Sequence, residues 1–301
     1  MTSDSAMKIK HLDQYLHLHF IVLIFGFTGI LGKLITFSAE YLVFYRLIFT
    51  LPFLFLFIKW RKQSLQVSRR DLIQFLLVGI IVGFHWITFF HSIKVSNVSI
   101  ALSCLACATL FVGILEPIFH KQKPHWIEIV LGIAVLVTLS LMLGFEISYV
   151  KGAIYGVLSA FLAATFNVMN KRFSNTKSSL TLTFYELIGA LIPVLGIIFF
   201  QNKGITAFPF PMKMDLVWLL LLASVCTAYP FAAIINIMKS LSAFTVTLAI
   251  NFEPIYAIIL AFFIFGDSEK MSTPFYIGVA IVMFIVFLYP SIKRKYSTQT
   301  V

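Results

Sequence analysis

Ten apolar runs make up almost the whole of this chain. Each run is about as long as the roughly 20 residues that cross a bilayer as a helix. They cover about residues 17–37, 41–58, 71–92, 96–118, 126–144, 152–171, 179–200, 215–237, 242–265 and 275–291. Several runs are joined by only a few residues, so consecutive helices must be antiparallel. The sequence therefore predicts an all-α integral membrane protein with ten transmembrane helices.

The composition excludes a soluble domain of this size. Apolar residue types make up 60% of the 301 residues and charged types only 12%, whereas about a quarter of a soluble domain is charged. A net charge of +11 would suit a nucleic-acid partner if the cations formed one basic surface. They instead separate the apolar runs, so we expect a lipid bilayer around the chain and no nucleic-acid partner.

The distribution of Lys and Arg predicts the orientation of the helices. With a cytoplasmic N-terminus, sixteen of the 23 cations fall on the cytoplasmic side and five on the other, and Lys33 and Arg46 lie within runs. Basic residues of short loops are retained in the cytoplasm. Ten helices return the basic tail 292–301 to the side of the N-terminal segment 1–15. We therefore expect both termini in the cytoplasm and the protein in the cell membrane, the inner or plasma membrane.

The two halves of the chain resemble each other at a nearly constant offset. Residues 44–48 (FYRLI) match residues 184–188 (FYELI), Lys94 matches Lys239, and Lys33 matches Lys171. Ordered matches of this kind indicate a duplicated unit. The predicted units are residues 16–145 and 151–291. Because each unit holds five helices, the second must enter the membrane from the opposite face, an inverted repeat typical of secondary transporters with a substrate site near the midplane.

The second half carries motifs that resemble a known family. Residues 248–257 (LAINFEPIYA), 265–267 (FGD) and 276–280 (YIGVA) resemble the Glu-Pro helix, the acidic exit turn and the closing helix of the EamA family in the drug/metabolite transporter superfamily. In the first half Thr109 stands in place of the proline and Lys121 in place of the acid. The resemblance implies a permease or exporter of small organic metabolites such as amino acids, working by alternating access.

Charged residues inside the runs are candidates for the substrate pathway, because a charge at the bilayer centre costs about 2.5–3.5 kcal/mol on insertion scales. Glu253 directly precedes Pro254, which removes a helix hydrogen bond. It either carries a proton during transport or is a neutral, hydrogen-bonded structural carboxyl. Arg46 either contacts an anionic substrate group or anchors its helix with the head at the interface.

Uncharged polar side chains in the runs either line a wet cavity or join helices by hydrogen bonds. The further candidates for the substrate pathway are Asn251, Tyr229, Asn167, Asn170, His85, Trp86 and Thr109. We expect Glu186 and Lys171 to form a structural ion pair on the inner side. Glycines spaced four residues apart, as at Gly79 and Gly83, predict close helix packing. We expect no metal and no cofactor, because no ligand set has metal spacing.

Other classes of protein remain as alternatives. A membrane-embedded enzyme would need a nucleophile or metal motif such as GxSxG or HExxH, and the sequence contains neither. A sensor or assembly protein would show no flux, and a channel would need a ring of like charges or a filter motif. Within the transporter class the direction of transport, coupling to protons, and a monomeric or homodimeric state are all open.

Overall fold

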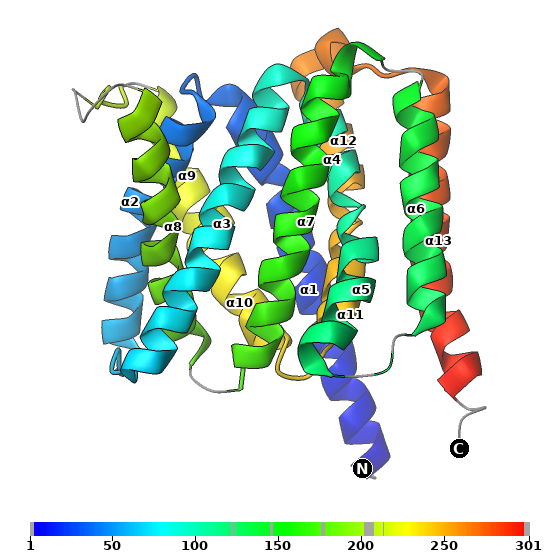
Figure 1. The fold of residues 1–301 in the computed structure, drawn as a ribbon, viewed down its shortest axis with the longest axis horizontal. Helices are drawn as coiled ribbons and strands as arrows, with labels where there is room; N and C mark the ends of the chain where they lie inside the picture. The colour runs from blue at the N-terminus through cyan, green and yellow to red at the C-terminus, as the bar shows by residue number, and fades with distance from the viewer. Residues whose placement is uncertain are drawn as a thin grey trace.

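The structure, a computed structural model, is built from helices (Figure 1). It describes the backbone of residues 3–121, 123, 125–144, 147–175, 178–201, 208–212 and 214–297, and side chains from residue 13 to residue 285 outside those gaps and 143, and at 288. The α-helices are α1 (Ser3–Leu34), α2 (Ala39–Trp60), α3 (Arg69–Val95), α4 (Val98–Leu105), α5 (Ala108–His120), α6 (Trp126–Gly144), α7 (Val150–Phe173), α8 (Ser179–Gln201), α9 (Met214–Ala223), α10 (Tyr229–Ile237), α11 (Ala243–Ile250), α12 (Glu253–Phe265) and α13 (Thr273–Ser297). Short 3-10 turns η1 (Ile147–Tyr149) and η3 (Gly266–Glu269) and a π-helical segment η2 (Ser224–Ala228) complete the described elements.

Eight helical segments in the described part are long and apolar enough to cross a bilayer. They are Asp13–Leu34, Ala39–Trp60, Arg69–Val95, Val98–His120, Ile147–Phe173, Ser179–Gln201, Met214–Ile237 and Ala243–Glu269. The other two predicted spans fall on α6 and α13, whose described apolar stretches are shorter. These two helices pack against each other and stand alongside the rest of the bundle (Figure 1). The all-helical membrane fold is confirmed, while ten crossing helices stay a prediction.

The helices pack in two groups, and each group combines both halves of the chain. In the first group α2 and α3 pack against α8, and α2 also packs against α9. Its buried residues include Leu42, Val78, Leu187 and Leu219. In the second group α5 packs against α6, α7 and α11, and α13 packs against α6. Its buried residues include Val112, Leu139, Ala160, Phe244 and Phe275. The two repeats are therefore interleaved in space, with α1 between the groups (Figure 1).

Three predicted spans are interrupted, which the sequence analysis did not predict in full. The run at 96–118 is divided into α4 and α5, the run at 242–265 into α11 and α12, and the run at 215–237 contains η2. Pro254 accounts for the second of these breaks, since proline cannot donate to the helix ladder. No proline lies at the break between α4 and α5, so tertiary contacts must maintain it.

The breaks in α4–α5 and α11–α12 have matching backbone geometry 145 residues apart. The N–H of Ala106 donates to the carbonyl three residues earlier, and the N–H of Asn251 does the same, both at 3.2 Å. The side chain of Asn97 caps α4, and that of Ser242, at the same offset, caps α11. In Figure 1, α4 and α11 lie at opposite ends of the bundle. These matches support the duplicated, inverted arrangement of the two halves.

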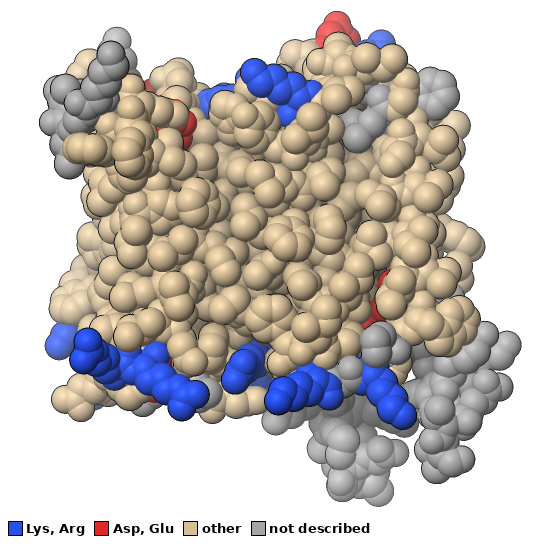
Figure 2. All heavy atoms as spheres, viewed as in Figure 1, with Lys and Arg blue, Asp and Glu red and all other residues tan. Residues whose placement is uncertain are grey.

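Basic side chains gather on one face of the molecule. Helix α1 begins and α13 ends on this face (Figure 1), and Figure 2 shows Lys and Arg along its edge. The exposed cations at the end of α2, the start of α3 and the end of α7 are Lys59, Arg61, Arg69, Arg70 and Arg172. The side chains of Lys8, Lys10, Lys177, Lys203, Lys213, Lys293, Arg294 and Lys295, also used in the charge argument, lie outside the described residues.

Glycines bring α3 and α8 into backbone contact. A Cβ atom added at Gly79 would overlap the carbonyl oxygen of Glu186, and one added at Gly189 would overlap that of Leu76. A Cβ atom added at Gly83 would likewise overlap the carbonyl oxygen of Ala190. The predicted role of Gly79 and Gly83 in close packing is confirmed, and it joins the third helix of the first repeat to the second helix of the other.

Substitution of Gly189 by alanine tests this contact. We expect Gly189→Ala to lower the free energy of unfolding by about 1–3 kcal/mol, because the added methyl forces the two helices apart. Gly196→Ala in the same helix is the matched control, since a Cβ there meets nothing within 4 Å. Thermal unfolding of the purified variants in detergent measures the difference. Equal melting temperatures for the two variants would contradict the contact.

Candidate functional site

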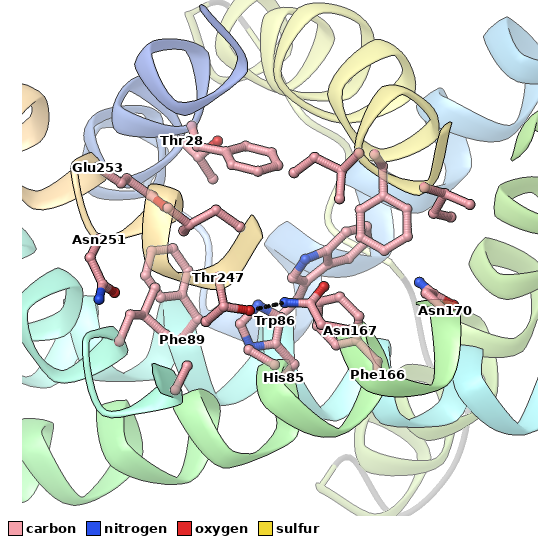
Figure 3. A pocket seen from close by; sticks show the side chains of 18 of the residues that line it. Thr28, His85, Trp86, Phe89, Phe166, Asn167, Asn170, Thr247, Asn251 and Glu253 are labelled. Carbon is pink, nitrogen blue, oxygen red and sulfur yellow. Dashed lines mark hydrogen bonds between the residues drawn. The ribbon is translucent and has the colours of Figure 1, made fainter. Parts of the chain in front are cut away.

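A cavity of about 100 Å³, the central cavity, lies beside the two broken helices. Its lining residues come from both repeats and are Phe25, Thr28, Arg46, His85, Trp86, Phe89, Leu105, Ala108, Ala163, Phe166, Asn167, Asn170, Phe231, Ile234, Ile235, Thr247, Ile250, Asn251 and Glu253. Figure 3 shows Thr28, Glu253 and Asn251 toward one end and Asn167 and Asn170 toward the other. Because liquid water occupies about 30 Å³ per molecule, this conformation has room for only a few waters.

Arg46 contributes a cation to the central cavity. Its Nε donates to the hydroxyl of Thr227 at 2.7 Å, and its guanidinium carbon lies 3.8 Å from the centroid of the Trp86 ring. The side chain is only 2% exposed, and its Nη1 has no hydrogen-bond partner in the described part of the chain. The guanidinium is therefore directed into the helix bundle and keeps one donor group available.

The π-helical segment η2 supplies the partner of Arg46. A π-turn leaves carbonyls without their usual helical donor, and such turns occur often at functional sites. The hydroxyl of Thr227 donates to the carbonyl of Leu222, five residues earlier, at 2.6 Å, and Thr50 on α2 donates to that of Ala223 at 3.1 Å. Thr227 is therefore an acceptor for Arg46 and a donor within its own helix.

Glu253 contributes a carboxyl to the same cavity. It is the first residue of α12, directly after the break, and it is 5% exposed. Its side chain makes no hydrogen bond to the described part of the chain. The start of a helix favours a carboxylate through the helix dipole. The central cavity therefore presents one acidic and one basic side chain, Glu253 and Arg46, from different repeats.

Histidine and amide side chains connect the walls of the cavity. His85 Nδ1 lies 3.0 Å from the carbonyl oxygen of Ser159 and 2.8 Å from its hydroxyl oxygen. Asn167 donates to Thr247 at 3.5 Å (Figure 3). These contacts join α7 to α3 and α11, and they fix the orientation of the ring and the amide.

The two breaks contact each other through a second amide. Asn251, between α11 and α12, donates to the hydroxyl of Thr109 in α5 at 2.7 Å. Thr109 is buried and does not line the cavity. Thr109 therefore holds the amide of Asn251 from outside the cavity.

Tyr229 lies apart from the central cavity. Its side chain is 45% exposed, and its hydroxyl lies 2.6 Å from Nε2 of His17. It lines a separate pocket of about 760 Å³ together with Arg61, Asn236 and Lys239. The structure thus brings Arg46, His85, Trp86, Asn167, Asn170, Asn251 and Glu253 together, but not Tyr229.

The predicted ion pair between Glu186 and Lys171 is wrong. Lys171 donates instead to the carbonyls of Met238 and Leu241, in the connection between α10 and α11, at 2.6 and 3.0 Å. Glu186 is fully buried and accepts a long bond of 3.4 Å from Asn170, and its Oε1 has no partner among the described residues.

Two hydroxyl residues of the cavity wall were not singled out from the sequence. Thr28 on α1 and Thr247 on α11 both line the central cavity. Thr28 lies between Gly26 and Gly29, where small residues allow α12 and α4 to approach α1. The glycines on either side of Thr28 were the feature of the sequence that could have indicated its position. Among the described residues no group of three or more His, Cys, Asp or Glu could hold a metal ion.

A helical membrane bundle of two related halves, with a cavity lined by both of them, is typical of membrane transporters. The family model of the EamA-like transporter family matches residues 15–144 and 150–289. The chain belongs to this family, and it is a multi-pass protein of the cell membrane.

Two further comparisons agree with this assignment. The chain is 28% identical over 182 residues to an uncharacterized transporter, YxxF, of Bacillus subtilis (strain 168). This match covers 57% of the chain and 58% of the relative, so the chain spans little more than half of the relative's length. A solved crystal structure of a protein with 14% identity matches 94% of this chain and 99% of its own with a TM-score of 0.68, which shows the fold alone.

Replacement of Arg46 by lysine tests the contacts of the guanidinium. Lysine has a methylene and not a hydrogen-bond donor at the position of Nε, and it has no planar face for Trp86. We expect Arg46→Lys to lower the free energy of unfolding by about 1–3 kcal/mol, because the buried hydroxyl of Thr227 then loses the donor that Nε supplies. Arg61→Lys, at an exposed site directly after the C-terminal end of the same helix, is the control. Thermal unfolding measures both, and an equal, small effect would contradict the assignment.

Proposed function

We propose that the protein is a secondary transporter that moves a small organic metabolite by alternating access, with both termini in the cytoplasm. The observation that carries this proposal is the central cavity, which lies beside both broken helices and is lined by both repeats. Discontinuous helices that meet at a polar midplane cavity are typical of secondary transporters. The substrate passes unchanged, so we propose no enzymatic step.

The polar groups of the cavity favour an amino acid as the substrate. A guanidinium with a free donor pairs well with a carboxylate, and Arg46 has such a donor. Glu253 is the matching partner for an ammonium group, and it makes no hydrogen bond to the described part of the chain. Phe89, Phe166 and Phe231 also line the cavity and suit an apolar side chain. Since the cavity holds about 100 Å³, it must widen when it opens to bind such a molecule.

Glu253 is our proposed proton carrier. An ionised carboxylate loses hydration when the cavity closes around it. A bound proton makes the carboxyl neutral, so the cavity can close around Glu253 and then open to the other side at a lower cost. Arg46 and His85 face the same cavity and are the other charged or titratable groups that would respond to its charge.

Flux through the purified protein in proteoliposomes tests the proposed function. A panel of labelled amino acids and other small metabolites is offered with and without an imposed pH gradient. We expect saturable uptake of amino acids that the gradient stimulates several-fold. Saturable flux of another compound class alone would contradict the proposed substrate, and flux indifferent to the gradient would contradict proton coupling.

Replacement of Glu253 tests its role separately. We expect Glu253→Gln to remove the stimulation by the pH gradient, because the amide cannot bind and release a proton. Glu40→Gln is the matched control, since Glu40 lies at the start of α2 away from the central cavity. If Glu253→Gln leaves both the flux and its pH dependence unchanged, Glu253 does not carry the proton.

A further inference from the structure

Two buried carboxylates outside the central cavity hold the free ends of the broken helices. Glu269 ends η3, directly after α12, and is 0% exposed; Glu116 lies in α5 and is 8% exposed. Neither side chain lines the central cavity. Both contact a helix of the other repeat.

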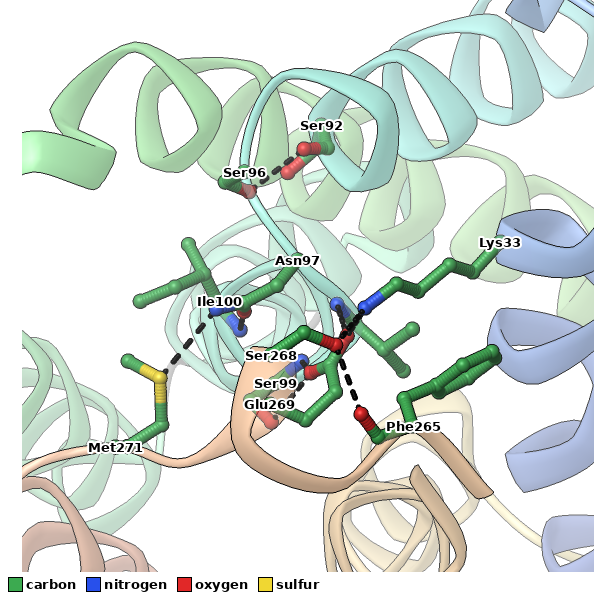
Figure 4. Close-up of polar contacts among 11 residues, drawn as sticks. Lys33, Ser92, Ser96, Asn97, Ser99, Ile100, Phe265, Ser268, Glu269 and Met271 are labelled. Carbon is green, nitrogen blue, oxygen red and sulfur yellow. Dashed lines mark hydrogen bonds and ion pairs between the residues drawn. The ribbon is translucent and has the colours of Figure 1, made fainter. Parts of the chain in front are cut away.

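Glu269 binds the start of α4 (Figure 4). Its Oε1 accepts from the N–H of Val98 and its Oε2 from the N–H of Ser99, both at 3.1 Å, and the hydroxyl of Ser99 donates to Oε2 at 3.0 Å. The first N–H groups of a helix have no partner within the helix and carry its positive dipole end. A carboxylate from the second repeat therefore ties down a half-helix of the first.

Glu116 makes the reciprocal contact with α11. Its Oε1 accepts from the N–H of Ala243 at 3.0 Å and its Oε2 from the N–H of Phe244 at 2.8 Å. These two donors follow Val98 and Ser99 at the same offset of 145 residues that relates the breaks. The two contacts are thus equivalent under the inverted repeat, although the carboxylates come from non-matching positions.

The two contacts differ in how a lysine supports them. Lys33 donates to Glu269 at 2.8 Å and to Ser268 at 3.0 Å (Figure 4). Lys171, its counterpart in the other repeat, donates instead to the carbonyls of Met238 and Leu241, between α10 and α11. Glu269 therefore has an ion pair in addition to its helix bonds, and Glu116 has none among the described residues.

Each of these half-helices is short and ends where the regular helical hydrogen bonds are interrupted. Both α4 and α11 are eight residues long, and each ends at a break with a tight turn in place of the regular ladder. Both contribute to the wall of the central cavity, α4 through Leu105 and α11 through Thr247 and Ile250. They lie at opposite ends of the bundle (Figure 1). Release of one free end would open the cavity toward one face only.

We propose that α4 and α11 are the two gates of the central cavity, and that Glu269 and Glu116 are positioning residues that hold them shut. This inference rests on the proposed alternating access. One carboxylate releases its half-helix while the other stays bound, so the two gates open in turn. The gate at α4 is the more firmly closed because Lys33 supports it.

Side-specific labelling tests the gates without any substrate. A reporter is made by Ala163→Cys, at the wall of the central cavity, in full-length protein with Cys104, Cys107 and Cys226 replaced by alanine. A charged, membrane-impermeant thiol reagent is added to sealed membrane vesicles of either orientation. The rate of labelling from each face is compared for Glu269→Gln, Glu116→Gln and the control Glu40→Gln.

The two variants are expected to act in opposite directions. Glutamine keeps the shape but replaces one accepting oxygen by a donor, so one charge-assisted bond to the helix is lost, which corresponds to roughly tenfold in the gate equilibrium. Glu269→Gln should raise labelling roughly tenfold from the face at which α4 begins, and Glu116→Gln from the opposite face. Glu40→Gln should change neither rate. Equal changes from both faces, or no change, would overturn the proposal.

Lys33→Met keeps the test decisive if the glutamine variants fail to fold. It removes the ion pair and leaves both helix bonds of Glu269, so we expect a smaller rise from the α4 face alone. No rise in a folded Lys33→Met protein would overturn the proposed support of that gate. Side-specific labelling without flux would count against the proposed substrate transport and not against the gates. Flux without side-specific labelling would overturn the gates alone.

Discussion

The absence of water in the hydrocarbon core governs this structure, because every backbone group exposed at an interrupted helix must find a partner inside the protein. Asn97 and Ser242 cap the two half-helices, and Glu269 and Glu116 take up their remaining leading N–H groups. At η2 it is the hydroxyl of Thr227 that satisfies a displaced carbonyl. The Thr227 contact borders the central cavity through Arg46, whereas the capped starts of α4 and α11 lie at opposite ends of the bundle (Figure 1).

A duplicated backbone carries a site that is not duplicated. Glu253 begins the second helix after one break, while Ala108 stands at the matching position after the other. Arg46 lines the cavity, whereas its sequence counterpart Glu186 is buried between α7 and α8. The inverted repeat therefore supplies the hinges and the packing, and divergence between the halves supplies the charges. A polar substrate thus meets different chemistry from each repeat.

Sequence reasoning reached the helices, the duplication and most of the polar residues of the cavity, because these follow from apolar run length, matched segments and the cost of charge in lipid. It did not reach the break after α4, where no proline marks it, nor the partners of Lys171, which depend on where α10 ends. It also aligned Asp267 and Lys121 as equivalent to the family acid. In the structure Glu269 and Glu116 bind the starts of α4 and α11. Which carboxylate reaches these N–H groups depends on how segments far apart in the sequence pack, and the alignment of the two halves does not show this.

Segment η2 also fixes which side of α10 faces the cavity. A π-turn holds one residue more than an α-helical turn, and each residue rotates a helix by about 100°. Phe231, Ile234 and Ile235 lie on the cavity side of α10, and Tyr229 and Asn236 line the other pocket. Loss of a single residue from η2 would turn α10 by about 100° and move Phe231, Ile234 and Ile235 away from the cavity. The extra residue in η2 therefore sets which side of α10 faces the central cavity.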